Sequence, residues 1–160
     1  MKKTVIAFAL LATTVLISTH AAKNESQSRF ITVSPNKAGN LVVPTEQITS
    51  TARFINYKTD SATVQLVAVR APDNSVRVAF NTCQSCNPSP RAFFMQKGNK
   101  LVCQNCGNSF TMQQVGIMRG GCNPAYIEQK EISADKITIP AAYLAQFAPR
   151  FKRWAGPTSE

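Results

Sequence analysis

Five cysteines between residues 83 and 122 are the side chains of this sequence best suited to chemistry. They occur as CQSC, then 16 residues, CQNC, then 15 residues, and finally GGCNP. Two C-x-x-C pairs at this separation are typical of a ribbon-type metal site, because each pair presents two sulfurs from one tight turn. The pattern therefore predicts a thiolate metal site built from the cysteines Cys83, Cys86, Cys103, Cys106 and Cys122.

Other ligand types are scarce. The only histidine, His20, lies within a predicted signal peptide, so the mature chain has no Cys/His zinc pattern, two-histidine copper pattern or Cys–His nucleophile. No Asp or Glu occurs from residue 74 to 127, which disfavours a calcium or magnesium site. Soft thioethers in the same region leave a Cu(I) site open, namely Met95, Met112 and Met118.

The role of the cysteines leaves several alternatives open. An iron-sulfur cluster, mononuclear iron and zinc all accept four sulfurs at this spacing. Cys122 is the odd thiol, and it is either a fifth or exchangeable ligand or the partner of another cysteine in a disulfide. A disulfide-stabilised binding module and a thiol-disulfide oxidoreductase are further alternatives. The enzyme is the less favoured interpretation, because redox C-x-x-C motifs usually lie at the start of a helix in a βαβ unit, whereas these follow a predicted strand in glycine-rich turns.

The start of the chain predicts export. MKK is followed by an apolar stretch over residues 4–17 and by small residues near 21, so residues 1–21 are expected to be a secretory signal peptide. The stretch is short for the roughly 20 residues that span a bilayer, and an uncleaved N-terminal anchor is the alternative. We expect a periplasmic or cell-envelope protein, where disulfides are permitted.

The charge balance bears on partners. The chain has 18 Lys+Arg and 8 Asp+Glu, and removal of Lys2 and Lys3 still leaves 16 basic residues. On an exported protein this charge favours an anionic envelope surface over nucleic acid, because a partner must share the compartment. A soluble basic surface with no dedicated partner is the plainer interpretation.

The elements expected to position the cysteines are mainly β. Residues 22–160 are expected to form a single domain, with a small antiparallel β scaffold over 30–81 and a cysteine-rich knuckle region over 82–126. Within ATVQLVAV, one face carries Val64, Leu66 and Ala68. The link RAPDNS joins this strand to SVRVAF in a predicted hairpin, whose second strand leads into Cys83.

The C-terminal segment PAAYLAQFAPRFKRW predicts a short helix over residues 140–154. Pro140 suits a first helical turn, and aromatic residues then recur at helical spacing until Pro149 interrupts the pattern. This helix is expected to cap the scaffold. The alternative is contact with an anionic membrane or a partner through its basic end, which contains Arg150, Lys152, Arg153 and Trp154.

These motifs together resemble a known family. VRVAFNTCQSC, LVCQNCGNSF and GGCNP, preceded by LVVPTEQI, look like the soluble cysteine-rich domain of the FtrD-like family of predicted bacterial membrane iron-sulfur-containing proteins. The resemblance implies a role beside ferrous-iron uptake, with a membrane iron permease or redox partner and the five cysteines as ligands. The family commonly has Asp two residues before its first cysteine, where this sequence has Asn81. We expect an exported carrier that docks on a membrane partner.

Overall fold

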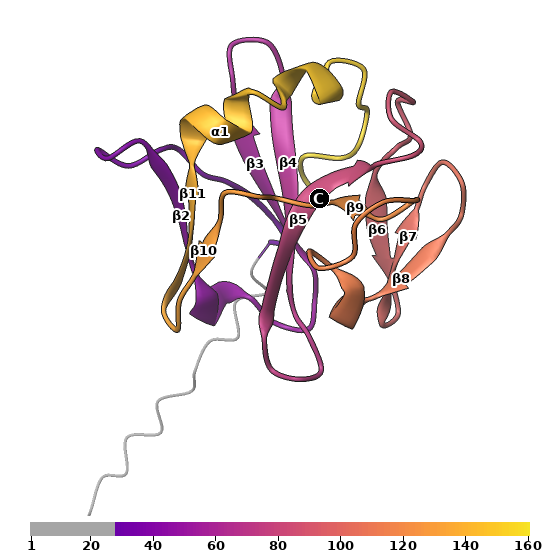
Figure 1. Ribbon diagram of the computed structural model, residues 1–160, viewed down its shortest axis with the longest axis horizontal. Coiled ribbons are helices and arrows are strands. Elements are labelled where there is room, and N and C mark those ends of the chain that lie inside the picture. The colour runs from indigo at the N-terminus through magenta and orange to yellow at the C-terminus, as the bar shows by residue number, and fades with distance from the viewer. Residues whose placement is uncertain (1–27) are drawn as a thin grey trace, which may run out of the picture.

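The computed structural model describes residues 28–160, which form a mainly β fold as predicted (Figure 1). The predicted signal peptide, residues 1–21, lies outside the described residues. Within the described part, eleven strands make three sheets, and one short α-helix lies near the C-terminus.

The central sheet has five strands in the order β1-β3-β4-β5-β9. Strand β1 is parallel to β3, and the remaining neighbours are antiparallel. The predicted hairpin is confirmed as β4 and β5, and it turns through Asn74 with a φ of 66°. The strands are β1 (Phe30–Thr32), β3 (Arg53–Lys58), β4 (Thr63–Arg70), β5 (Val76–Cys83) and β9 (Pro124–Ala125).

Both faces of this sheet are buried, because alternate residues of its strands enter two different cores. Val64, Leu66 and Ala68 of β4 lie in the first core, which confirms the predicted alternation. Val67 and Val69 of the same strand lie in the second core. The central sheet is therefore the layer that the two cores share.

The first core is covered by a second sheet of order β10-β11-β2 and by the helical segments. In Figure 1 this sheet stands on the opposite side of the central strands from β6, β7 and β8. Strand β11 pairs with β2 although more than ninety positions separate them in sequence. The strands are β2 (Asn40–Pro44), β10 (Glu131–Ile132) and β11 (Lys136–Pro140).

The second core is covered by a third sheet, of order β6-β7-β8, which lies inside the predicted knuckle region. This region therefore contains more regular structure than its glycines indicate. Cys83 and Cys103 are part of the second core, so the thiols are built into the packing of this lobe. The strands are β6 (Phe94–Lys97), β7 (Lys100–Cys103) and β8 (Ser109–Thr111).

The helical segments are short. The predicted helix over 140–154 is instead an α-helix, α1 (Ala141–Ala145), and a separate 3-10 turn, η3 (Ala148–Phe151), because Pro149 lacks the amide that would continue the helix. Two further 3-10 turns are η1 (Thr45–Gln47) and η2 (Met112–Gln114). Among residues 28–160, no helix has both the length and the apolarity required to span a membrane.

Candidate metal centre

The first cysteine pair lies where β5 ends and the chain turns sharply. The amide of Cys83 donates to the carbonyl of Ala92 at 2.9 Å, which holds the far end of the loop against the strand. The amide of Asn87 then donates back to the carbonyl of Cys83 at 3.1 Å, closing a knuckle around the pair. Cys83 is buried and Cys86 is half-buried.

The second pair repeats this arrangement at the end of β7. The amide of Gly107 donates to the carbonyl of Cys103 at 2.9 Å, which is the bond that Asn87 makes in the first knuckle. Gly107 has a φ of +77°, as expected for a residue that turns the backbone around the sulfurs. Cys103 is buried and Cys106 is exposed. The two knuckles are joined where the amide of Gln104 donates to the carbonyl of Phe93 at 2.8 Å.

Cys122 reaches the same place from a loop that is tied to the first knuckle. The side-chain oxygen of Gln84 accepts a hydrogen bond from the amide of Gly120 at 2.7 Å. The amide of Gln84 donates to the carbonyl of Asn123 at 3.2 Å. Cys83 Sγ lies 3.4 Å from the carbonyl oxygen of Cys122. Gln84, inside the first C-x-x-C motif, thus holds the loop that carries Cys122. The spacing of the cysteines did not reveal this role.

The structure brings four of the five thiols into one group. The sulfur atoms of Cys83, Cys86, Cys106 and Cys122 all lie within 4.8 Å of one another. Cys103 is not in this group, but its Sγ lies 3.9 Å from Cys86 Sγ. The sequence predicted all five cysteines as ligands without ranking them, and in the fold Cys122 joins the group of four whereas Cys103 lies just outside it. We call Cys83, Cys86, Cys106 and Cys122 the four-sulfur set.

The chemistry and spacing of the four-sulfur set fit a metal ion. A tetrahedral ion with bonds of about 2.3 Å to thiolates holds its sulfurs roughly 3.8 Å apart, which a group within 4.8 Å reaches through small side-chain movements. A cluster distributes its thiolates over more than one iron and therefore holds them further apart. The arrangement fits a single four-coordinate ion most directly.

The surroundings treat the thiols differently. Burial raises the pKa of Cys83 and also that of Cys103, because the charged thiolate loses its hydration. Burial also acts to raise the pKa of Cys86, but hydrogen bonds from Asn105 and from neighbouring thiols outweigh it and lower the pKa overall. The carboxamide of Asn105, inside the second C-x-x-C motif, thus favours a thiolate in the first.

Asn81, two residues before the first cysteine, is buried and its side chain is satisfied by hydrogen bonds. Its Oδ1 accepts from the amide of Phe94 at 2.8 Å, and its Nδ2 donates to Gln65 Oε1 at 2.7 Å. The carbonyl of Asn81 accepts from the indole nitrogen of Trp154 at 2.9 Å. Its amide joins β5 to β6 and thereby positions the two knuckles, a task that needs both a donor and an acceptor.

A second cluster holds the loop that carries Cys122. The guanidinium of Arg119 lies 4.0 Å from the ring centroid of Tyr126, and its Nη2 is 3.0 Å from Glu128 Oε2. Lys130 Nζ covers the same ring at 3.6 Å. These contacts connect the loop to the segment after β9, so they support the position of Cys122.

Comparison with known proteins agrees with these features. Residues 48–151 match the family model described as "Membrane iron-sulfur containing protein FtrD-like", a range that includes all five cysteines and more than half of the chain. No curated protein and no solved structure matched the chain. The match and the cysteine group together indicate a metal-related function.

Proposed function

Because this chain belongs to the FtrD-like family of membrane iron-sulfur containing proteins, we propose that it is an exported, sulfur-ligated iron protein. It serves as an accessory electron-transfer or iron-handling component of a ferrous-iron uptake system in the cell envelope. The observation that carries the proposal is the four-sulfur set, whose atoms lie within 4.8 Å of one another. No side chain other than sulfur is needed to complete it.

The ligands of the site differ in burial, so some hold the metal inside the fold and one leaves it accessible. Cys83 is buried in the second core and anchors the set, whereas Cys106 is exposed and offers a route to a partner. Asn105 forms a hydrogen bond with the Cys86 thiol, and Gln84 holds the loop of Cys122 by accepting a hydrogen bond from the amide of Gly120. When bound, an iron held by thiolates supplies one-electron chemistry at a potential that hydrogen bonds to sulfur and solvent exposure adjust.

A structural zinc site is the second candidate, and burial favours it. Cys83 and Cys103 are part of the second core, so a redox-inactive ion bound beside them would stabilise this lobe without transferring electrons. A thiol-disulfide oxidoreductase has less support, because both C-x-x-C pairs follow strands and sit in turns instead of at the start of a helix.

Metal analysis of protein purified from the envelope without oxygen tests the proposal. We expect iron, with visible charge-transfer absorption that bleaches or shifts on reduction. Acid-labile sulfide in proportion to iron identifies a cluster, and iron without sulfide identifies a single ion. A colourless protein with stoichiometric zinc would show that the site has a structural role. Absence of both metals, together with two disulfides in the mass spectrum, would overturn the proposal.

A further inference from the structure

Two segments that are distant in sequence meet beside the first cysteine knuckle. Asn87 Nδ2 donates to the carbonyl of Arg150 at 2.8 Å, and the amide of Ala155 donates to the carbonyl of Pro90 at 2.9 Å. The rings of Phe93 and Trp154 meet edge to face, with centroids 5.9 Å apart. The chain from 150 to 155 therefore runs along the loop that follows Cys86.

This junction gathers positive charge. No Asp or Glu occurs in residues 74–127 or in residues 136–159, so neither segment brings an acid to it. Four exposed cations lie on the two segments, and within residues 28–160 none of them forms an ion pair. We call these residues the basic corner: Arg91, Arg150, Lys152 and Arg153.

The basic corner lies close to the metal centre. Ser89 Oγ accepts from the amide of Arg91 at 3.2 Å and donates to Asn105 Oδ1 at 2.8 Å. Asn105 directly precedes Cys106, the exposed member of the four-sulfur set, and Asn87, which holds Arg150, directly follows Cys86. Two short hydrogen-bonded connections therefore link the corner to the two more accessible knuckle cysteines.

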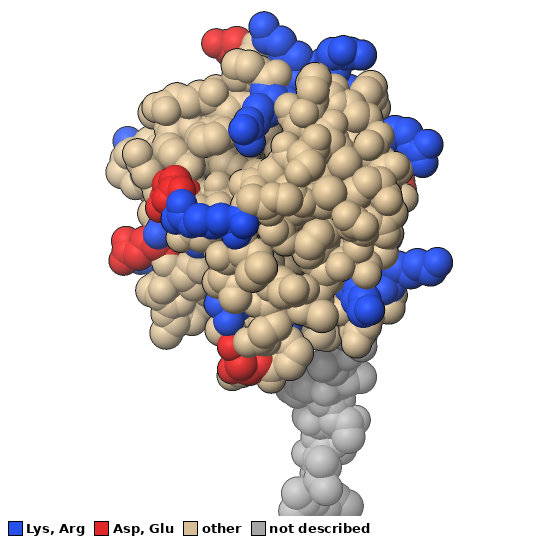
Figure 2. All heavy atoms as spheres, turned by 45° about the vertical axis from the view of Figure 1, so that its right-hand side comes forward, with Lys and Arg blue, Asp and Glu red and all other residues tan. Residues whose placement is uncertain are grey.

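The surface around the lobe has the same character. In Figure 2, Lys and Arg side chains rim the right-hand part of the molecule around a broad uncharged area, and almost no acid is visible there. Unpaired cations at the edge of a surface steer a partner of opposite charge and fix its orientation, and they contribute to association rate more than to affinity.

From this arrangement we propose that the basic corner is the docking surface for an acidic patch on a partner protein, which it places next to the exposed Cys106. The inference rests on the proposed function, because it supplies the partner chemistry for that site. Carboxylates of the partner pair with the four cations, and the uncharged surface beside them brings the partner close to the exposed sulfur.

A protein partner is favoured over a membrane because the aromatic residues next to the basic corner are already packed or hydrogen-bonded inside the fold. The indole of Trp154 donates to the carbonyl of Asn81, and Phe151 is buried in the first core. The exposed large apolar side chains of the described residues are Ile117, Met118 and Ile132, none of which belongs to the corner. The corner therefore offers charge without a side chain to insert into lipid.

Binding of fluorescent poly-L-glutamate tests this assignment, with phosphatidylglycerol vesicles as a second probe. The test variant is Arg91→Glu/Arg153→Glu, and the matched control is Lys37→Glu/Lys97→Glu, which changes the net charge equally at exposed positions outside the corner. Both variants are compared with wild type at about 0.02 M and about 0.15 M salt, since electrostatic attraction weakens as screening increases with salt. Carbodiimide coupling then locates bound carboxylates on lysines.

We expect the test variant to bind polyglutamate at least about tenfold more weakly than wild type, and the control to change less than about twofold. Coupling should concentrate on Lys152 over Lys37 and Lys97. Equal loss in both variants would overturn the corner as a specific surface, as would vesicle binding that exceeds polyglutamate binding and depends on the same residues. Metal content is measured in the same samples, so absence of iron would reject the proposed function without altering this result.

Discussion

At the scale of single residues, Cys122 and Cys103 both lie near the metal centre, but only Cys122 is one of its four grouped thiols. Cys122 is in the four-sulfur set, whereas Cys103 lies outside it, with its Sγ 3.9 Å from Cys86 Sγ. Replacement of a ligand removes one of four bonds to the metal, whereas replacement of a neighbouring buried thiol leaves a small cavity.

We therefore expect Cys122→Ala to lower iron occupancy to less than about half of the wild-type value, because three thiolates hold the ion less tightly. Cys103→Ala should retain nearly all of the iron and lose about 1 kcal/mol of stability from reduced packing. Iron per protein, measured by emission spectrometry on anaerobic samples, distinguishes the two variants. The reverse pattern, with iron lost from Cys103→Ala and retained in Cys122→Ala, would show that the two C-x-x-C pairs form the site by themselves.

At the scale of elements, the loop before Cys122 depends on Gly116. This residue has a φ of +69°, and a Cβ built on it would meet the carbonyl oxygen of Val78 at 2.3 Å. The loop can therefore lie against β5 only if position 116 has no side chain. Gly39 has a similar φ of +74°, but a Cβ there would meet nothing within 4 Å.

We expect Gly116→Ala to lower the free energy of unfolding by about 3 kcal/mol or more, because backbone strain and the clash with β5 add. Gly39→Ala should cost only about 1 kcal/mol, from strain alone. Chemical denaturation of both variants measures the difference. Equal losses would mean that the loop moves away from β5 at little cost, and the close approach would then not position Cys122.

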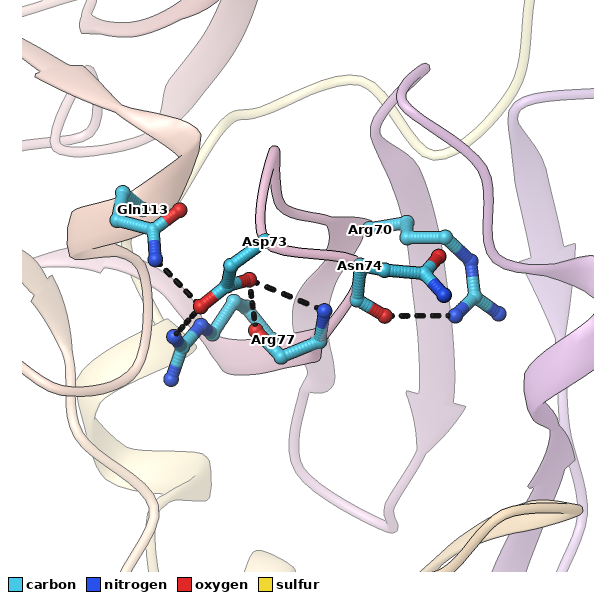
Figure 3. A network of polar contacts seen from close by, with 6 residues as sticks. Arg70, Asp73, Asn74, Arg77 and Gln113 are labelled. Atoms are coloured by element: carbon cyan, nitrogen blue, oxygen red, sulfur yellow. Dashed lines mark hydrogen bonds and ion pairs between the residues drawn. The ribbon is translucent and has the colours of Figure 1, made fainter.

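The turn between β4 and β5 is a second element with a measurable role. Asp73 accepts hydrogen bonds from the hydroxyl and amide of Ser75, and its other oxygen accepts from Gln113 of η2 and from Arg77 (Figure 3). The hydrogen bonds from Ser75 are the main reason that the pKa of Asp73 falls from 3.8 to about 2. The turn thus connects the central sheet to the cysteine-bearing lobe.

A carboxyl with a lowered folded-state pKa stabilises the fold above its unfolded pKa and loses that contribution as the pH falls. For Asp73 the loss falls between about pH 4 and about pH 2, the interval set by the two values. We expect Asp73→Asn to flatten the decline of the unfolding free energy in this interval, as measured by urea titration. Asp60→Asn is the control, since the exposed Asp60 carboxylate forms no hydrogen bond or ion pair within residues 28–160, and it should keep the wild-type slope. An unchanged slope in Asp73→Asn would contradict the assignment.

At the scale of the whole molecule, two cores share one sheet, and the thiols belong to only one of them. Cys83 and Cys103 pack in the second core with residues of β6 and β7, whereas β2 and β11 cover the first core. Binding of a metal to the four-sulfur set should therefore stabilise one lobe more than the other.

Removal of the metal with a chelator under reducing conditions should increase amide hydrogen exchange in β6, β7 and β8 by at least about tenfold, while exchange in β2 and β11 changes little. Mass spectrometry of the exchanged peptides reports both regions in one experiment. A uniform increase through both lobes would show that the chain opens as a single unit, and no increase would show that the metal does not support the fold.

Much of the scaffold is predictable from the sequence because its signals are local. The alternation around Leu66 fixes which residues share a face, and Pro72 and Asn74 specify the turn that follows. The knuckles are equally local, since each C-x-x-C pair closes its own turn. The predicted length of the C-terminal helix was wrong, because the break at Pro149 divides it into α1 and η3.

The remaining features depend on contacts between distant segments, which periodicity does not encode. The pairing of β11 with β2 joins residues such as Ile139 and Leu41. The inclusion of Cys122 in the four-sulfur set depends on Gln84, which holds its loop. Side-chain bonds of this kind leave no mark on hydrophobic spacing, so the sequence predicts the five cysteines as one region without ranking them.

The central claim is that iron is held by four thiolates, and X-ray absorption at the iron edge tests it most directly. The sample is the full chain, purified without oxygen from the cell envelope. The account predicts a first shell of four sulfur atoms around iron, at a single distance, supplied by Cys83, Cys86, Cys106 and Cys122. A first shell made mainly of oxygen or nitrogen, or protein without iron, would contradict it.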